Sequence, residues 1–387
     1  MVKQNMNIIK KTLCRIYNKI YWKFIYKLEQ KNEIFFINEY HYNLLVKKID
    51  KKNILTKKQK QEIDIYYKKH YGKKIPYIWH NCFTKYSGKF DVRYIPVNIF
   101  TDYLFSLKLI KDKTYYEILQ DKNFLYSLAK YADVKVPKRF FYSIGNIFFN
   151  SDNKIISREI FYKEMSNIGE IFIKPTDIYT TGSAKNCRIL NIVNGIDINS
   201  KRTIKEIIEQ NYNKDFVVQE RIVCHKSISA LYSKSVNTFG LTTIILNNEI
   251  KTLHTLLKIG MAGNTFDYGG AEKKGLLIPI KEDGTLSDRA FCLNEQKEYF
   301  SHPDTNITFK DYKIELFPKV LETAKKLQSC IPWMPFCGLD FTINEQGEVL
   351  LVEIEMPSCS VIQSILGESF FGDYTDQILF SLKNNKN

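Results

Sequence analysis

The alternation of hydrophobic and polar residues is most regular near the C-terminal end of the chain. Two alternating runs, residues 336–343 and 348–355, flank a polar segment that ends in Gly347. Alternating runs joined by a short glycine-containing turn predict a β-hairpin. We expect Ile343 to pair with Glu348 across this hairpin. In that register one face carries the side chains of residues 340, 351, 353 and 355.

Other stretches predict the remaining elements by their spacing. Within the first 75 residues, apolar residues at three- and four-residue steps predict amphipathic helices with a basic polar face. Helices are expected over residues 56–70, 115–131 and 312–328. Strands are expected over residues 139–144, 171–175, 187–190, 216–222, 235–245 and 253–260. The aromatic segment 75–103, which is interrupted by Pro and Gly, predicts a connector packed on the body of the protein.

Composition and charge describe a globular protein with a basic N-terminal part. The 387 residues are 44% hydrophobic, enough for two or three domains. The net charge is +15, and the first 75 residues hold 19 Lys or Arg against 6 Asp or Glu. This excess suits an anionic membrane surface or nucleic acid, but it also fits a chain rich in Lys, Asn, Ile and Tyr throughout. The basic stripe is likewise typical of either an interfacial helix or a surface helix packed on its own domain.

The sequence gives no indication of a membrane span or of export. It has no run of 18 apolar residues, and lysines interrupt the N-terminal apolar residues too often for a signal peptide. Eight cysteines are scattered without a CxxC pair, which is typical of reduced thiols and not of a disulfide framework or a zinc site. We therefore expect a cytoplasmic protein, with peripheral association at the inner face of the membrane as an open alternative.

Three carboxylates converge on the predicted hairpin face: Asp340, Glu353 and Glu355. Their mutual repulsion raises at least one pKa unless a cation lies among them. Mg²⁺ takes oxygen ligands and is commonly shared between carboxylates and nucleotide phosphates. The same pattern is also typical of an edge hairpin with a solvated acidic face. The hairpin alone leaves both readings open.

A second candidate site is the loop between the strands predicted at 171–175 and 187–190. It is rich in Thr, Gly and Ser, with Lys174 at its entry and Lys185 near its exit. Backbone amides exposed by small residues, with a Lys reaching in, can form a phosphate cradle. The loop has neither a Walker pattern nor GxGxxG, so an ordinary hairpin loop remains the alternative.

The order of these motifs resembles a known family. In sequence order they are IFIKP with TTGSAK, VQERI, SVNT, KIG with DYGG, HPDT, GLDF and VEIE. This collinear series, from about Asp121 to Gln363, resembles the ATP-grasp superfamily, and within it the branch associated with sugar transfer and surface-polysaccharide biosynthesis. The resemblance implies an α+β fold in which two α+β subdomains grip ATP. It divides the chain into a basic, mainly helical N-terminal region with its connector, an N-terminal ATP-grasp part with the phosphate-binding loop, and a C-terminal subdomain with the metal-binding hairpin: 1–115, 116–218 and 219–387.

The resemblance also implies roles for individual residues. The residues expected to bind ATP are Lys122, Lys174, Thr181, Gly182, Ser183, Gln219, Glu220 and Ile222. The expected Mg²⁺ ligands are Asp340, Glu353 and Glu355. The expected catalytic, acceptor-side residues are Asn237, Thr238 and Lys258, with Gly269 and Gly270 beside them. The chain departs from the family pattern at three positions, with Glu in place of Asn, Gly in place of Arg and Lys in place of Arg: Glu355, Gly240 and Lys258.

The function that the resemblance implies is ATP- and Mg²⁺-dependent carboxylate–amine ligation through an acyl phosphate. The acid would be a sugar acid, free or linked to a nucleotide or lipid, and the amine an amino acid or small amine, in capsule or O-antigen polysaccharide biosynthesis. Glycan-assembly enzymes are expected as neighbours and nucleic acid is not. The alternatives are a ligase that forms a peptide or other metabolite and a catalytically impaired nucleotide-binding scaffold. The sequence leaves open whether His225 and His302 contact ligand or serve the fold.

Overall fold

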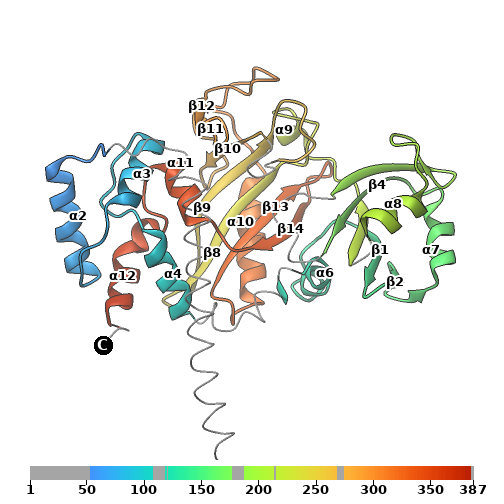
Figure 1. Cartoon of the computed structure of the whole chain (residues 1–387), viewed down its shortest axis with the longest axis horizontal. Coiled ribbons are helices and arrows are strands. Elements are labelled where there is room, and N and C mark those ends of the chain that lie inside the picture. Colours follow the sequence, from blue (N-terminus) through green and yellow to red (C-terminus); the bar gives the residue numbers. More distant parts are fainter. Residues whose placement is uncertain are drawn as a thin grey trace, which may run out of the picture.

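The protein consists of two antiparallel sheets with helices around them (Figure 1). The computed structural model describes residues 53–107, 118–119, 121–176, 187–212, 215–267 and 274–384. In Figure 1 the first sheet lies on the right, the second in the centre and the N-terminal helices on the left, beside the last helices of the chain. The two α+β subdomains expected from the sequence therefore each contain one sheet.

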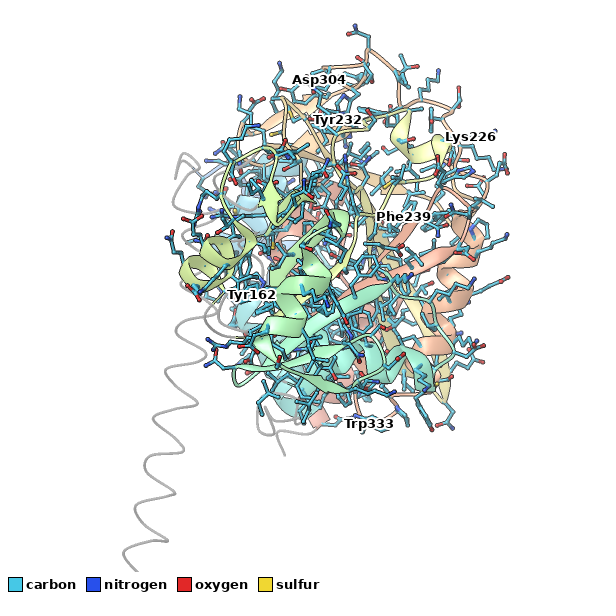
Figure 2. All side chains as sticks on the ribbon, turned by 90° about the vertical axis from the view of Figure 1, so that its right-hand side faces the viewer. Tyr162, Lys226, Tyr232, Phe239, Asp304 and Trp333 are labelled. Carbon is cyan, nitrogen blue, oxygen red and sulfur yellow. The ribbon has the colours of Figure 1, made fainter. Side chains whose placement is uncertain are left out.

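The first sheet has the strand order β3-β2-β1-β7-β4-β5-β6. Its strands are β1 (Arg139–Ile144), β2 (Ile147–Asn150), β3 (Ile155–Ile156), β4 (Gly169–Pro175), β5 (Arg188–Val193), β6 (Ile196–Asp197) and β7 (Phe216–Glu220). Helices α7 (Arg158–Met165) and α8 (Ile204–Asn211) contribute buried residues to its small core. Figure 2 turns this side toward the viewer, with Tyr162 of α7 labelled. Because β7 runs to Glu220, the predicted boundary at 218/219 cuts through a strand of this sheet.

The second sheet has the order β12-β11-β10-β9-β8-β13-β14. Its strands are β8 (Thr238–Leu246), β9 (Glu249–Gly260), β10 (Gly275–Ile280), β11 (Ala290–Cys292), β12 (Lys297–Tyr299), β13 (Phe336–Ile343) and β14 (Val349–Glu355). Helix α10 (Phe317–Ser329) packs against β8, β9, β13 and β14. The helix predicted from residue 312 begins five residues later, because backbone hydrogen bonds tie Tyr312 and Ile314 to residues 284–286 instead. With α10 on one face, the opposite face of the sheet is left for the site.

The N-terminal helices share one core with the second sheet and the C-terminal helices. These helices are α2 (Lys57–His70), α3 (Ile78–Ser87), α4 (Val97–Ser106), α11 (Cys359–Leu366) and α12 (Thr375–Asn384). Buried Gln363 of α11 connects the two groups, since its side chain hydrogen-bonds both the backbone N (2.6 Å) and the backbone O (3.0 Å) of Ile95. The segment 75–103 packs on the body of the protein as predicted, and it contains α3 and most of α4.

The structure also tests the predictions about helix ends, membrane spans and cysteines. Thr56 caps α2 through a capping box, which confirms the helix predicted over 56–70. The helix predicted over 115–131 is interrupted: residues 118–119 are helical, Asp121 is extended, and α6 (Lys122–Tyr131) begins after it. The stripe before residue 53 lies outside the described residues. No helix within the described ranges is both long and apolar enough to cross a membrane. Six cysteines of the described residues are reduced thiols: Cys82, Cys224, Cys292, Cys330, Cys337 and Cys359.

Candidate active site

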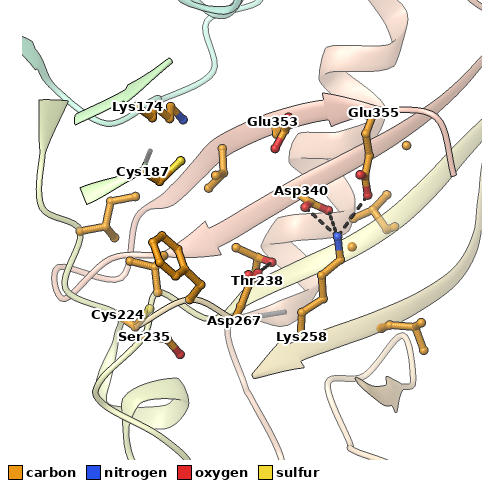
Figure 3. A pocket seen from close by; sticks show the side chains of 18 of the residues that line it. Lys174, Cys187, Cys224, Ser235, Thr238, Lys258, Asp267, Asp340, Glu353 and Glu355 are labelled. Carbon is orange, nitrogen blue, oxygen red and sulfur yellow. Dashed lines mark hydrogen bonds and ion pairs between the residues drawn. The ribbon is translucent and has the colours of Figure 1, made fainter. Parts of the chain in front are cut away.

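A cavity of about 850 Å³ opens between the two sheets (Figure 3). The first sheet contributes β4, β5 and β7 to its wall, and the second contributes β8, β9, β10, β13 and β14. Helices α4, α6, α9 (Lys226–Ser229) and α11 and several loops contribute the rest of the lining. Its size is in the range of ligand sites, and it holds most of the candidate residues that the structure describes.

The hairpin of β13 and β14 brings the three predicted carboxylates to this cavity, in a register different from the predicted one. Ile343 pairs with Val349, not Glu348, and a bulge then places Asp340 opposite Glu353. The register shifts because the Asn344 side chain accepts a hydrogen bond from the Glu348 backbone N (2.8 Å), which keeps Glu348 in the turn. Because the bulge adds one residue to β14, residue 351 pairs with residue 341 and lies on the buried side. The prediction that residue 351 shares a face with Asp340 is therefore wrong.

Lys258 of β9 occupies the space between two of these carboxylates. Its Nζ donates to Asp340 Oδ1 (2.8 Å), Asp340 Oδ2 (2.7 Å) and Glu355 Oε1 (3.1 Å), as the dashed lines of Figure 3 show. Burial opposes the charge of Lys258, but Asp340 and Glu355 outweigh it and raise the pKa of this ammonium well above its ordinary value. Burial raises the pKa of Asp340, and Lys258 opposes that shift. Lys258 is therefore a charged group within the carboxylate cluster.

Gly240 of β8 provides the room for this ammonium. A Cβ at that position would lie 2.4 Å from Lys258 Cε and 3.1 Å from its Nζ. It would also lie 3.2 Å from Asp340 Oδ1. Contacts below 3.0 Å are not tolerated without movement, so any larger residue would displace Lys258. The two departures from the family pattern at positions 240 and 258 are thus sterically linked.

Two further lysines face the same cavity from the first sheet and α6. Asp121 caps α6 by accepting from the backbone N of Asn123 and Phe124, which places Lys122 in the first turn, with its Nζ 3.0 Å from Glu353 Oε1. Lys174 at the end of β4 is 6% exposed, and burial, reinforced by Lys122, lowers its pKa to about 8. Burial would raise the pKa of Glu353, but Lys122 and Lys174 together lower it. This side of the cavity therefore carries an excess of positive charge.

The residues predicted to read the base lie along β7 and just after it. Gln219, Glu220 and Ile222 all line the cavity. The Glu220 carboxylate accepts a hydrogen bond from the backbone N of Lys138 (2.8 Å), and the Glu220 backbone N donates to the Lys138 carbonyl (2.9 Å). These bonds fix the end of β7 beside the cavity. Backbone groups of this segment, with Glu220 beside the nucleotide, remain the predicted contacts.

Asn237 does not line the cavity, so the geometry does not support its predicted catalytic role. It is completely buried, with Nδ2 donating to the Tyr232 carbonyl (2.7 Å) and Oδ1 accepting from Ser235 Oγ (2.6 Å). The other residues of the SVNT motif, Ser235, Val236 and Thr238, do line the cavity, and Thr238 Oγ1 donates to Asp267 Oδ2. Asp267 is a fourth carboxylate beside the Lys258 cluster; only the glycines of its DYGG segment were predicted as site residues.

The two histidines left open by the sequence both serve the fold. His225 caps α9 (Lys226–Ser229), with Nδ1 accepting from the Ser227 backbone N. His302 is fully buried, with Nε2 2.9 Å from the Gly260 carbonyl and its ring stacked on that of Tyr232, which Figure 2 labels. Burial lowers the pKa of His302. The remaining candidates, Thr181, Gly182, Ser183, Lys185, Gly269 and Gly270, lie outside the described residues.

Comparison with known proteins decides the family. Residues 105–377 match the profile of the family described as "Sugar-transfer associated ATP-grasp". The chain belongs to this family. The predicted ATP-grasp membership and its α+β two-sheet fold are confirmed. No curated protein matches the chain.

Solved ATP-grasp structures resemble the chain distantly. The VanG D-Ala:D-Ser ligase of Enterococcus faecalis is 15% identical with a TM-score of 0.39, over 69% of this chain and 62% of the ligase. The D-alanyl-alanine synthetase A of Vibrio cholerae is 12% identical with a TM-score of 0.40, over 69% and 65%. The L-amino acid ligase of Bacillus licheniformis is 11% identical with a TM-score of 0.34, over 64% and 43%. The chain thus covers less than two thirds of each of these proteins.

ATP-grasp enzymes use ATP and Mg²⁺, and the donor chemistry of the cluster fits that metal. Asp340, Glu353 and Glu355 offer only carboxylate oxygens, the ligands that Mg²⁺ takes. In the described part of the chain no three His, Cys, Asp or Glu side chains group closely enough to hold a metal by themselves. Asp340 and Glu353, which face each other across the hairpin, would therefore hold Mg²⁺ jointly with nucleotide phosphates.

Proposed function

We propose that this protein is an ATP-dependent carboxylate–amine ligase that forms an amide through an acyl phosphate. The observation that carries the proposal is a single cavity that brings the ammonium groups of Lys122 and Lys174 together with the carboxylates of Asp340 and Glu353. Phosphoryl transfer needs this combination of phosphate binding and charge neutralisation. The family's association with sugar transfer favours a sugar acid and an amino acid or small amine as substrates.

The proposed reaction has two steps. A carboxylate oxygen of the acid attacks the γ-phosphorus of ATP, the bond to the β,γ-bridging oxygen breaks, and ADP leaves. The amine nitrogen then attacks the acyl carbon, phosphate leaves with the electron pair of the C–O bond, and the amine proton passes to solvent. Lys122 and Lys174 would neutralise phosphate oxygens in the first step. Bound Mg²⁺ supplies further withdrawal of charge from the terminal phosphates.

Lys258 suits the carboxylate group of a substrate. Its buried ammonium lies between the carboxylates of the second sheet, within the same cavity as the phosphate-side lysines. A charged group held there by Asp340 can pair with an incoming carboxylate as a point charge. We propose that it binds a carboxylate group of one of the two substrates, with Thr238 and Asp267 on the acceptor side.

The test is release of ADP from ATP and Mg²⁺ across a panel of uronic acids and amines. We expect ADP release that requires both an acid and an amine. Lys174→Met should abolish it, whereas Lys251→Met, which removes a lysine of β9 that pairs with Glu249 outside the cavity, should leave it unchanged. Nucleotide binding with no substrate-dependent ADP release across the panel would overturn the proposal.

A second candidate function is a nucleotide-binding scaffold without turnover. It is favoured by one observation: Lys258 already engages both Asp340 oxygens and Glu355. In that case Glu355→Asn, which restores the residue usual in the family, should produce ADP release that the natural protein lacks. For either function, we propose that the protein works in the cytoplasm, beside glycan-assembly enzymes at the inner face of the membrane.

A further inference from the structure

The cavity continues beyond the charged cluster into a region with apolar walls, here called the apolar end. It is formed by side chains of α4, β9, β10 and α11: Phe100, Leu104, Leu256, Leu277, Val361 and Ile362. Leu277 pairs with Lys258 across β9 and β10, and Leu256 pairs with Gly240 across β8 and β9. The apolar end therefore lies directly beside the Lys258 ammonium.

The apolar end and the phosphate-side lysines lie on opposite sides of the carboxylate cluster. Strand order across the second sheet is β10-β9-β8-β13-β14. Lys122 reaches the β14 end of this row, at Glu353, whereas Leu256 and Leu277 belong to the β9 and β10 end. Helix α11 contacts both α4 and β10, which closes that end (Figure 1). A nucleotide on the lysine side would thus leave the apolar end for the other substrate.

The walls of the apolar end are fixed by packing. Phe100 and Leu104 are each 2% exposed. The Phe100 ring makes edge contacts with Phe336 and Phe370, at centroid distances of 5.9 and 5.3 Å. These contacts hold α4 against the second sheet and place its side chains without help from a ligand. The apolar end is therefore preformed, as ligand pockets usually are.

The chemistry of the walls selects the kind of group that fits. The chief polar side chains at the apolar end are those of Thr242 and Ser358. Within the described part of the chain, the buried Oγ of Ser358 has no hydrogen-bond partner. A sugar ring placed here would leave most of its hydroxyls without partners, which weakens binding. A hydrocarbon group would instead gain free energy with each methylene that leaves water.

From this arrangement we infer that the apolar end binds the side chain of an apolar amino acid, which serves as the amine substrate. The inference rests on the proposed ligase function and specifies its second substrate. The amino acid's carboxylate pairs with Lys258, and its ammonium lies among the carboxylates of Asp267 and Glu355 until it loses a proton on attack. The sugar acid then occupies the cavity nearer to β14 and the phosphates.

The test uses the full chain with a non-hydrolysable ATP analogue and Mg²⁺, titrated calorimetrically with glycine, 2-aminobutyrate, norvaline and norleucine. We expect affinity to rise about fourfold per methylene, the equivalent of ~0.8 kcal/mol for each buried CH₂. Equal affinity along the series would overturn the inference. So would tighter binding of dodecylamine than of norleucine, since that result would assign the apolar end to a lipid chain.

Variants and turnover separate this inference from the ligase proposal. Val361→Phe, which fills the apolar end, should remove the chain-length dependence. Leu366→Phe on the same helix, outside the cavity, should preserve it. If Val361→Phe unfolds, Val361→Ile should weaken norleucine more than glycine. A chain-length dependence without ADP release would refute the ligase and keep the pocket, whereas ADP release with equal affinities would do the reverse.

Discussion

Replacing Gly240 with Ala should displace the ammonium that neutralises the carboxylate cluster. The new methyl group would lie 2.4 Å from Lys258 Cε, so Lys258 must move. Its movement withdraws Nζ from the Asp340 oxygens, at 2.7 and 2.8 Å. Gly240 is not in the left-handed region of backbone conformation, so an alanine here brings no backbone strain. The whole effect should therefore pass through Lys258.

The expected magnitude follows from two contributions. Lys258 Cε lies near the end of a flexible side chain that lines the cavity, so its displacement alone costs little. Removing one partner of a buried ion pair costs about 3–5 kcal/mol, an upper limit here because Lys258 is shifted and not deleted. We expect Gly240→Ala to lower the free energy of unfolding by about 2–4 kcal/mol. In a Lys258→Ala background the methyl group has room, and replacing glycine within a strand should stabilise by roughly 0.5–1 kcal/mol. The effect should therefore change sign.

The assay is a double-mutant cycle of the natural protein, Gly240→Ala, Lys258→Ala and the double variant. Urea unfolding followed by tryptophan fluorescence gives the four free energies, and equal slopes against urea show that the unfolded states are comparable. Lys251→Ala, an outlying lysine on the same strand, serves as the control for truncation of a β9 lysine. If Gly240→Ala costs the same with and without Lys258, the proposed steric link between the two positions is wrong.

Three further predictions follow from individual groups. Because Lys174 is charged below its pKa of about 8 and neutral above it, nucleotide affinity should fall as pH rises from 7 to 9. Over pH 8–10.5 the contribution of Lys174 to the free energy of unfolding should rise with pH, because the folded state no longer buries a charge that the unfolded chain retains. Calorimetry measures the affinity and thermal unfolding measures the stability, each against pH. A Lys174→Arg variant should show neither effect. Gln363→Leu should lower the free energy of unfolding by about 2–4 kcal/mol, since it leaves two buried backbone groups of Ile95 unpaired; Gln377→Leu, an exposed control, should change it by less than about 0.5 kcal/mol. Glu355→Asn should change the number of Mn²⁺ ions bound per nucleotide, as read by electron paramagnetic resonance; an unchanged number would exclude Glu355 as a metal ligand.

The sequence predicted the elements whose signals are local. The hairpin of β13 and β14, the strand β1 and the capped helix α2 follow from alternation, turn residues and a capping box within a few positions. The hairpin's register could not be predicted the same way. One side-chain hydrogen bond of Asn344 and a bulge in β14 determine it, and neither leaves a periodic signal.

The candidate site shows the same division. Asp340 and Glu353 could be predicted from the sequence because each lies in an alternating run, and the two runs form neighbouring strands. The placement of Lys258 between Asp340 and Glu355 was not, because it depends on Gly240, a residue of another strand that acts by having no side chain. Asn237 illustrates the opposite error: a motif position suggested chemistry, but the local loop hydrogen-bonds both the Oδ1 and the Nδ2 of its amide.

The packing of α4 against α11 has a consequence for synthesis. About 250 residues separate the end of α4 at Ser106 from the start of α11 at Cys359. At roughly 5–20 residues per second, the ribosome needs roughly 10–50 s to make that stretch. During this interval Phe100 and its neighbours have no finished surface to pack against. The nascent chain should therefore depend on chaperones that shield its N-terminal helices until the last tenth of the protein has emerged.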